Sequence, residues 1–86
     1  MVSKEFTIKN KVGLHARPAS LFVKKAKEYS SKISIAANGE EVDGKSMLSV
    51  LTLGAVKGTL IVIKADGDDE KEAVDALIET LNGFED

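Results

Sequence analysis

The chain has 86 residues, 43% of them hydrophobic, which suffices for one compact domain over residues 1–86 but not for a second domain or a deep nucleotide or sugar cleft. Because it contains no cysteine and one histidine, it excludes disulfides, thiolate zinc sites, thiol catalysis and multi-histidine metal sites. The net charge is -2, residues 1–6 lack a signal-peptide core and the longest apolar run, 60–63, is too short for a membrane span, so we expect a cytoplasmic protein without membrane insertion.

The first third of the chain predicts a strand, a loop and a helix. Phe6 and Ile8 alternate with polar residues, as in a strand with one buried face, and residues 10–13 end that pattern. Pro18 suits the first turn of a helix, where its missing N–H would have no partner, so a helix is expected to begin near Ala16. Its buried stripe would be formed by Ala19, Phe22, Val23 and Ala26.

The middle of the chain predicts a hairpin followed by a short helix. Ile33 and Ile35 belong to an alternating run, the pair Asn38-Gly39 favours a type I′ turn, and residues 40–43 form a short returning strand. Ser46 is expected to cap a short helix. The run 59–65 then predicts a central strand.

The last third predicts one helix. Asp69 and Glu72 have the spacing of a capping box, and Gly83 is expected to end the helix in the left-handed conformation. The buried stripe between them comprises Val74, Leu77, Ile78 and Leu81. The element order is βαββαβα, which indicates an α+β fold with helices packed on one face of an antiparallel sheet.

The only histidine, arginine and proline of the chain fall within the tetrapeptide His15-Ala16-Arg17-Pro18, at the expected start of the first helix. A helix N-terminus presents N–H groups without intrahelical partners and the positive end of the helix dipole, and it therefore stabilises anions. In this interpretation His15 is a nucleophile for a phosphoryl group, Arg17 clamps its charge, and Pro18 holds the turn. The alternative is an exposed loop histidine beside a solvated arginine.

The segment Gly13-Leu14-His15-Ala16-Arg17-Pro18-Ala19 resembles the phosphohistidine signature of the HPr family, and the likeness extends over essentially all 86 residues. Residues 45–54 are similar to the family's segment around its regulatory serine. The resemblance implies an open-faced β-sandwich with three helices on one face of a four-stranded antiparallel sheet. It also implies a carrier without a cofactor, which accepts a phosphoryl group on Nδ1 of His15 from enzyme I and passes it to enzyme IIA domains of the phosphoenolpyruvate-dependent sugar phosphotransferase system.

The resemblance further implies a docking surface on the first helix and the short helix. Carried over by position, its members are Ala16, Arg17, Ser20, Lys24, Lys27, Met47, Leu48, Leu51 and Gly54. Residues 1–32 hold eight basic and two acidic side chains, without the interleaved aromatics of a single-strand binder, so we expect acidic protein partners, no nucleic acid and a monomer. The alternative is that the apolar members are core and the lysines a solvated face.

Residues 39–46 match the phosphate-loop pattern G-x-x-x-x-G-K-[ST], which alone would suggest a nucleotide hydrolase. We reject that interpretation because such a loop follows a buried parallel strand and opens a long helix, whereas here it spans a hairpin strand. The resemblance implies instead that Ser46 is phosphorylated by an HPr kinase and that the product binds a catabolite-repression regulator. The residues after Ser46 depart from the isoleucine, methionine and glycine usual in kinase-regulated members, which leaves kinase recognition open. A regulatory or nitrogen-branch paralogue is the alternative function.

Overall fold

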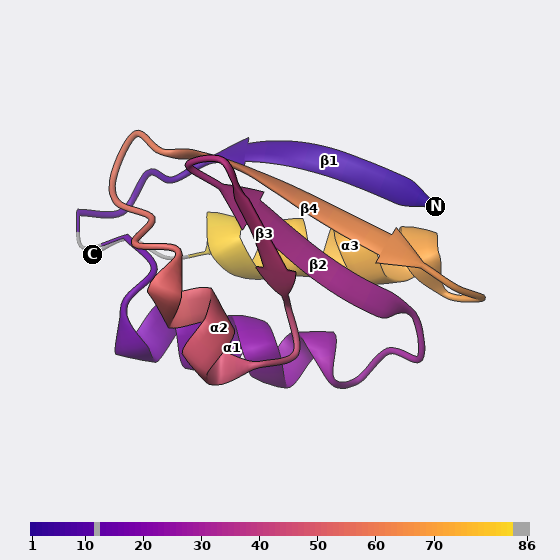
Figure 1. Ribbon diagram of the computed structural model, residues 1–86. Coiled ribbons are helices and arrows are strands. Elements are labelled where there is room, and N and C mark those ends of the chain that lie inside the picture. Colours follow the sequence, from indigo (N-terminus) through magenta and orange to yellow (C-terminus); the bar gives the residue numbers. More distant parts are fainter. Residues whose placement is uncertain (12, 84–86) are drawn as a thin grey trace.

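The computed structural model describes residues 1–11 and 13–83 and shows four strands and three helices (Figure 1). In chain order they are β1 (Val2–Thr7), α1 (Ala16–Ala26), β2 (Lys32–Ala37), β3 (Glu40–Asp43), α2 (Met47–Thr52), β4 (Leu60–Asp66) and α3 (Glu70–Asn82). The predicted order βαββαβα is confirmed. No helix within these described ranges is long and apolar enough to cross a membrane.

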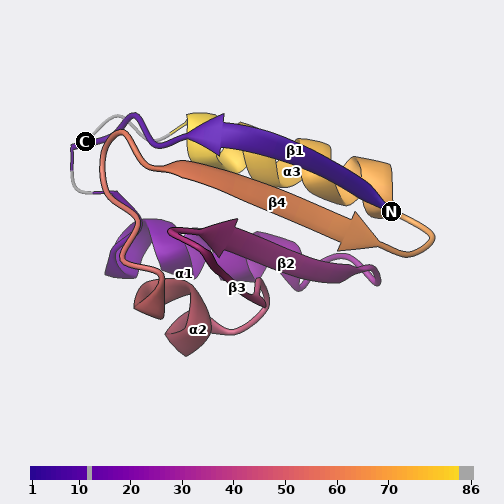
Figure 2. The same cartoon turned by 45° about the horizontal axis from the view of Figure 1, so that its top comes forward.

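The four strands form one antiparallel sheet in the order β1-β4-β2-β3, so both β1 and β3 are edge strands (Figure 2). Side chains alternate between the two faces of a strand. Ile35 of β2 and Ile63 of β4 are paired in register and fully buried, whereas Ser34 and Lys64 form the neighbouring pair and are half-buried. The helices cover only the first of these faces, which gives the predicted open-faced β-sandwich.

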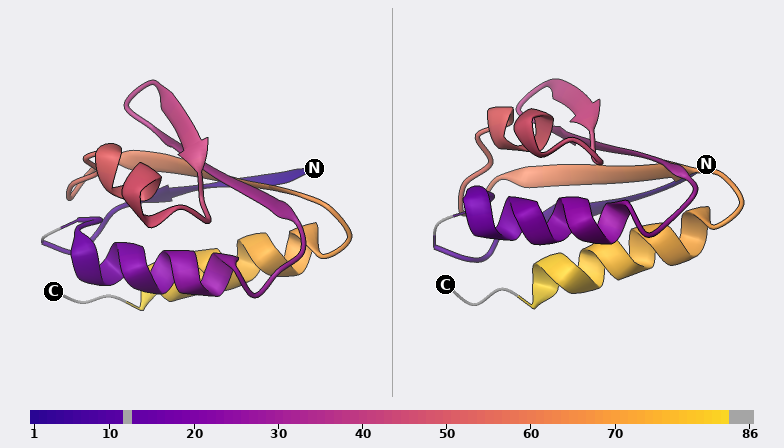
Figure 3. Two further views of the ribbon diagram at one scale, coloured as in Figure 1. Left: turned by 60° about the horizontal axis from the view of Figure 1, so that its bottom comes forward. Right: turned by 90° about the horizontal axis from the view of Figure 1, so that it is seen from below.

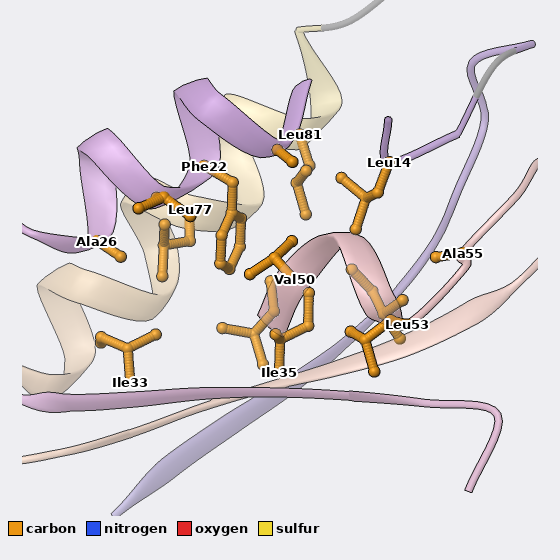
Figure 4. Packing of buried hydrophobic residues seen from close by; sticks show 14 of the residues in the cluster. Leu14, Phe22, Ala26, Ile33, Ile35, Val50, Leu53, Ala55, Leu77 and Leu81 are labelled. Atoms are coloured by element: carbon orange, nitrogen blue, oxygen red, sulfur yellow. The ribbon is translucent and has the colours of Figure 1, made fainter. Parts of the chain in front are cut away.

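Helices α1 and α3 lie side by side beneath the sheet (Figure 3). Phe22 of α1, Leu77 of α3 and Val50 of α2 are completely buried and meet in the core against the sheet (Figure 4). Burying a large apolar side chain of this kind stabilises the fold by about 1.5–3 kcal/mol. The buried stripe therefore fixes which face of α1 is left for solvent, and this is the face that carries the polar residues of the candidate site.

The hairpin between β2 and β3 is the one predicted from sequence. Asn38 and Gly39 have φ angles of 53° and 84°, and a type I′ turn requires positive φ at both of its central residues. The phosphate-loop pattern begins in this turn and continues along β3, an edge strand of an antiparallel sheet, into the six-residue helix α2. A nucleotide-binding loop follows a buried parallel strand and opens a long helix, so residues 39–46 do not have the surroundings of such a loop.

Two predictions about the ends of α3 are wrong. The Asp69 carboxylate turns away from α3 and accepts hydrogen bonds from the backbone N–H groups of Ser30 and Ser31, at 2.9 and 3.0 Å, and from the Ser31 hydroxyl. These donors belong to the turn before β2, where Ser31 is buried and needs a partner. Gly83 has a φ of -81°, because its N–H still bonds to the carbonyls of Glu79 and Thr80 and the helix ends in the right-handed conformation.

The hydrogen bonds that Asp69 accepts from Ser30 and Ser31 should make the stability of the fold depend on pH. The hydrogen bond from the Ser31 hydroxyl, with those from the Ser30 and Ser31 backbone, lowers the pKa of Asp69 from 3.8 to about 2. A depressed pKa in the folded state gives stability that is present above the unfolded value and lost as the pH falls through the folded value. Between about pH 4 and pH 2, the wild type should therefore lose more stability than Asp69→Asn, as measured by urea unfolding at constant ionic strength.

The neighbouring exposed residue supplies a matched control for this experiment. Asp68→Asn removes a carboxylate one position away, outside the hydrogen bonds to Ser30 and Ser31, and should follow the wild-type profile. Equal pH profiles for the wild type and Asp69→Asn would contradict the assignment.

Candidate functional site

The loop between β1 and α1 is seated against the segment that precedes β4. The N–H of Ile8 bonds to the carbonyl of Thr59 at 2.9 Å, and the N–H of Leu14 bonds to the carbonyl of Ala55 at the same distance. The Leu14 side chain is only 4% exposed and points into the core on the side of Ala55 (Figure 4). Residues 13 and 14 are thus held from both backbone and side chain, immediately before the histidine.

Gly13 is required at its position for two reasons. Its φ is +68°, in the left-handed region that favours glycine. A Cβ added there would collide with the carbonyl oxygen of Ala55 and would lie 2.7 Å from Cα of Val56. The close approach of these two backbones brings the start of α1 against the chain that follows α2.

His15 is the N-cap residue of α1, with an extended backbone at φ -98° and ψ -163°. Its carbonyl accepts the first hydrogen bond of the helix from the N–H of Ala19, at 2.9 Å, and its side chain is exposed. Pro18 is buried in the first turn, as predicted, whereas Ala16 and Arg17 are exposed. The imidazole is therefore open to another protein and belongs to the residue at which the helix begins.

The electrostatic surroundings of His15 favour an anion. The helix N-terminus contributes partial positive charge, and the first turn of α1, all of it described, carries no acidic residue. Within residues 1–11 and 13–83, Arg17 forms no ion pair that would engage its guanidinium. Together, the free guanidinium and the helix N–H groups can solvate the three oxygens of a phosphoryl group on the ring.

A shallow hollow between α1 and α2 brings together four of the residues predicted for the docking surface. It is lined by Ser20, Val23, Lys24, Lys27 and Met47. Leu48 is 74% exposed, whereas Met47 and Leu51 are half-buried and pack on the core. The alternative that these apolar residues are core thus holds in part for Met47 and Leu51 and not for Leu48. Gly54, with a φ of +62°, is exposed just after α2.

Sequence reasoning did not single out Val56, an exposed apolar residue beside the loop before His15. Its side chain is 58% exposed, and its Cα lies beside Gly13, at the base of the loop that presents His15. Val56 lies in the connection between Gly54 and Gly58, which has no helical or strand periodicity from which its exposure could be predicted. Its place became visible only when the two segments, about forty residues apart, were seen in contact.

Ser46 caps α2 as predicted, since its Oγ accepts a hydrogen bond from the N–H of Ser49 at 3.3 Å. The preceding Lys45 directs Nζ to the carbonyl of Tyr29, at 2.7 Å, just beyond α1. In a phosphate-binding loop this lysine would reach a nucleotide. In this fold the hydrogen bond from Lys45 instead joins the turn before α2 to the segment that follows α1.

Comparison with known proteins agrees with this geometry. A family profile described as "PTS HPr component phosphorylation site" matches residues 2–83. The phosphocarrier protein HPr of Borreliella burgdorferi is 50% identical over 84 residues, which cover 98% of each chain. The crystal structure of HPr-C-His from Thermoanaerobacter tengcongensis has a TM-score of 0.87 and 42% identity, and covers 99% of each chain.

A third relative carries a regulatory name. A crystal structure of Crh, described as a catabolite-repression protein of Bacillus subtilis that forms a domain-swapped, intertwined dimer, has a TM-score of 0.76 and 34% identity, and covers 95% of this chain and 94% of that one. The profile match over nearly the whole chain and the identity to named phosphocarriers decide the family. The chain therefore belongs to the HPr family, the phosphocarrier proteins of the phosphotransferase system of sugar transport.

Proposed function

We propose that His15 accepts a phosphoryl group from phospho-enzyme I and passes it to sugar-specific enzyme IIA domains. The chain acts in the cytoplasm as one monomeric HPr-like domain, residues 1–86, and as a carrier rather than a free-standing catalyst. The observation that supports this proposal is the exposed imidazole of His15 at the N-terminus of α1, within the segment that resembles the family's phosphohistidine signature.

The transfer step follows from the chemistry of a neutral imidazole. With its proton on Nε2, the ring presents a lone pair at Nδ1, which attacks the phosphorus atom. A phosphorus–nitrogen bond forms as the bond between phosphorus and the donor atom breaks, and the electron pair of the broken bond stays with the donor. The guanidinium of Arg17 and the N–H groups at the start of α1 stabilise the charge on the phosphoryl oxygens throughout. Pro18 fixes the turn in which they meet.

The docking surface carries cations around an apolar centre. Ser20 and Lys24 on α1 and Lys27 at its C-cap line the hollow with Met47, and Leu48, the next residue of α2, is exposed. Ala16, Leu51 and Gly54 complete the surface proposed for enzyme I and enzyme IIA. Such a pattern suits acidic partner surfaces and raises the association rate through long-range attraction.

Ser46 is proposed as a regulatory phosphorylation site. Its hydroxyl caps α2 directly before Met47 and Leu48, so a phosphate there would place about -1.5 to -2 charges against the apolar part of the docking surface and repel acidic partners. An HPr kinase would install it, and a catabolite-repression regulator would bind the product. The likeness to Crh supports this role, and the regulatory or nitrogen-branch paralogue remains the second candidate function. The retention of His15 with Arg17 and Pro18 favours the carrier.

Intact-mass measurement tests the carrier function. Incubation with enzyme I, magnesium and phosphoenolpyruvate is expected to add one acid-labile phosphoryl group to the wild type and none to His15→Ala. Absence of the modification in the wild type, with an enzyme I that phosphorylates the Borreliella HPr in parallel, would point to the regulatory function. The same measurement with ATP and an HPr kinase reads an acid-stable group on Ser46, with Ser46→Ala as its control.

A further inference from the structure

Asn10 is a buried polar residue whose amide the transfer chemistry does not use. It is only 6% exposed and lies between β1 and α1, five positions before His15. Its side-chain Nδ2 donates a hydrogen bond to the backbone carbonyl of Gly13 at 2.9 Å, and the backbone carbonyl of Asn10 accepts one from the N–H of Gly13 at 3.3 Å. The side chain and the backbone of Asn10 thus each bond to Gly13, and the buried side-chain amide has its partner there.

The bond from Asn10 completes the restraint on one peptide group. The carbonyl of Gly13 is held by Nδ2 of Asn10, and the N–H on the opposite edge of the same peptide, which belongs to Leu14, is held by the carbonyl of Ala55. Because a peptide group is planar, bonds on both edges prevent it from turning about the chain axis. The next rotatable bonds along the chain are those of Leu14, whose side chain is buried, and then those of His15.

We infer that Asn10 is a positioning residue, which sets the direction from which the His15 ring meets the incoming phosphorus atom. This inference rests on the proposed function of His15. Asn10 does not touch the reacting atoms; it acts through the Gly13–Leu14 peptide. Transfer between two proteins requires the attacking nitrogen, the phosphorus and the leaving atom to lie nearly in line, so a small rotation of the ring lowers the rate without weakening docking.

Two variants of Asn10 separate the hydrogen bond from the shape of the side chain. Asn10→Ala removes both, and Asn10→Asp keeps the shape but presents a carboxylate, which cannot donate to the carbonyl of Gly13. With the chain as varied substrate of enzyme I and phosphoenolpyruvate, both variants should lower kcat by about ten- to a hundredfold and leave KM within about twofold. The amide of Leu14 should exchange its hydrogen faster in both variants than in the wild type.

Ser31→Ala serves as the matched control. It removes another buried polar side chain, at the turn beyond the opposite end of α1, and with it one hydrogen bond to Asp69. This variant should lower the unfolding midpoint in urea while kcat, KM and the exchange of the Leu14 amide stay at their wild-type values. Any loss of kcat due to lower stability alone would appear in this control.

Three outcomes would overturn the inference. They are a wild-type kcat in Asn10→Asp, a rise in KM in place of a fall in kcat, and an equal loss of kcat in Ser31→Ala. If the wild type itself takes no phosphoryl group, the proposed function fails and this inference fails with it. A phosphorylated wild type with unaffected Asn10 variants would remove the inference alone.

Discussion

Replacing Arg17 by glutamate should slow phosphoryl transfer through His15 by roughly two to three orders of magnitude. The guanidinium is exposed in the first turn of α1 and unpaired within the described residues, so it is available to the phosphoryl oxygens. Glutamate puts a negative charge in its place, which repels both the transferring group and an acidic partner. The rate of transfer from phospho-enzyme I, followed by rapid quench, measures the effect.

The control for Arg17→Glu is a charge reversal elsewhere on the surface. Lys71→Glu on α3 changes the net charge by the same amount but lies outside the proposed docking surface, and its transfer rate should stay within a few-fold of the wild type. Both side chains are exposed, so the free energy of unfolding should change by no more than about 0.5 kcal/mol in either variant. Transfer at the wild-type rate in Arg17→Glu would remove Arg17 from the mechanism.

Gly13→Ala should destabilise the fold far more than a glycine substitution usually does. An alanine at a φ of +68° costs about 1–2 kcal/mol. Its Cβ would also press on the backbone of Ala55 and Val56, which overpacking studies put at about 1–3 kcal/mol more. A total of about 2–5 kcal/mol is a large share of the stability of a small domain. Urea unfolding measures it.

Gly54 offers a nearly ideal comparison for Gly13. Its φ of +62° is almost the same, yet a Cβ there meets open space, with no described atom within 4 Å. Gly54→Ala should therefore lose only the conformational part, about 1–2 kcal/mol. The difference between the two variants isolates the contact with residues 55 and 56. Equal losses in both would show that this contact yields without strain.

Local patterns were sufficient to predict most of the fold. The apolar stripe from Ala19 to Ala26 predicted α1, and Asn38-Gly39 predicted the hairpin turn, because each pattern depends only on neighbours in sequence. Asp69 was misread because its spacing to Glu72 fits a capping box, while the donors it actually binds, at Ser30 and Ser31, come from a turn nearly forty residues earlier. A local rule cannot weigh such a distant competitor.

The candidate site, too, could be predicted from the sequence only in part. The sequence alone marked the junction around His15, since the single histidine, arginine and proline coincide there, and resemblance gave the junction a function. Nothing in the sequence pointed to Asn10, which reads as an ordinary loop residue. Its importance depends on Ala55, which approaches from the other side of the same peptide only in the folded chain.

In the proposed function, His15 and the hollow between α1 and α2 belong to one docking surface, and this limits how the carrier can work. A donor and an acceptor that both need this face exclude each other, so no ternary complex can form and every cycle includes two dissociations. Throughput then depends on residence time. With an association rate constant of about 10⁷ M⁻¹ s⁻¹ and a Kd of about 1 μM, a complex lasts about a tenth of a second. Tighter binding would slow the flow of phosphoryl groups, so selection on this face favours speed over affinity.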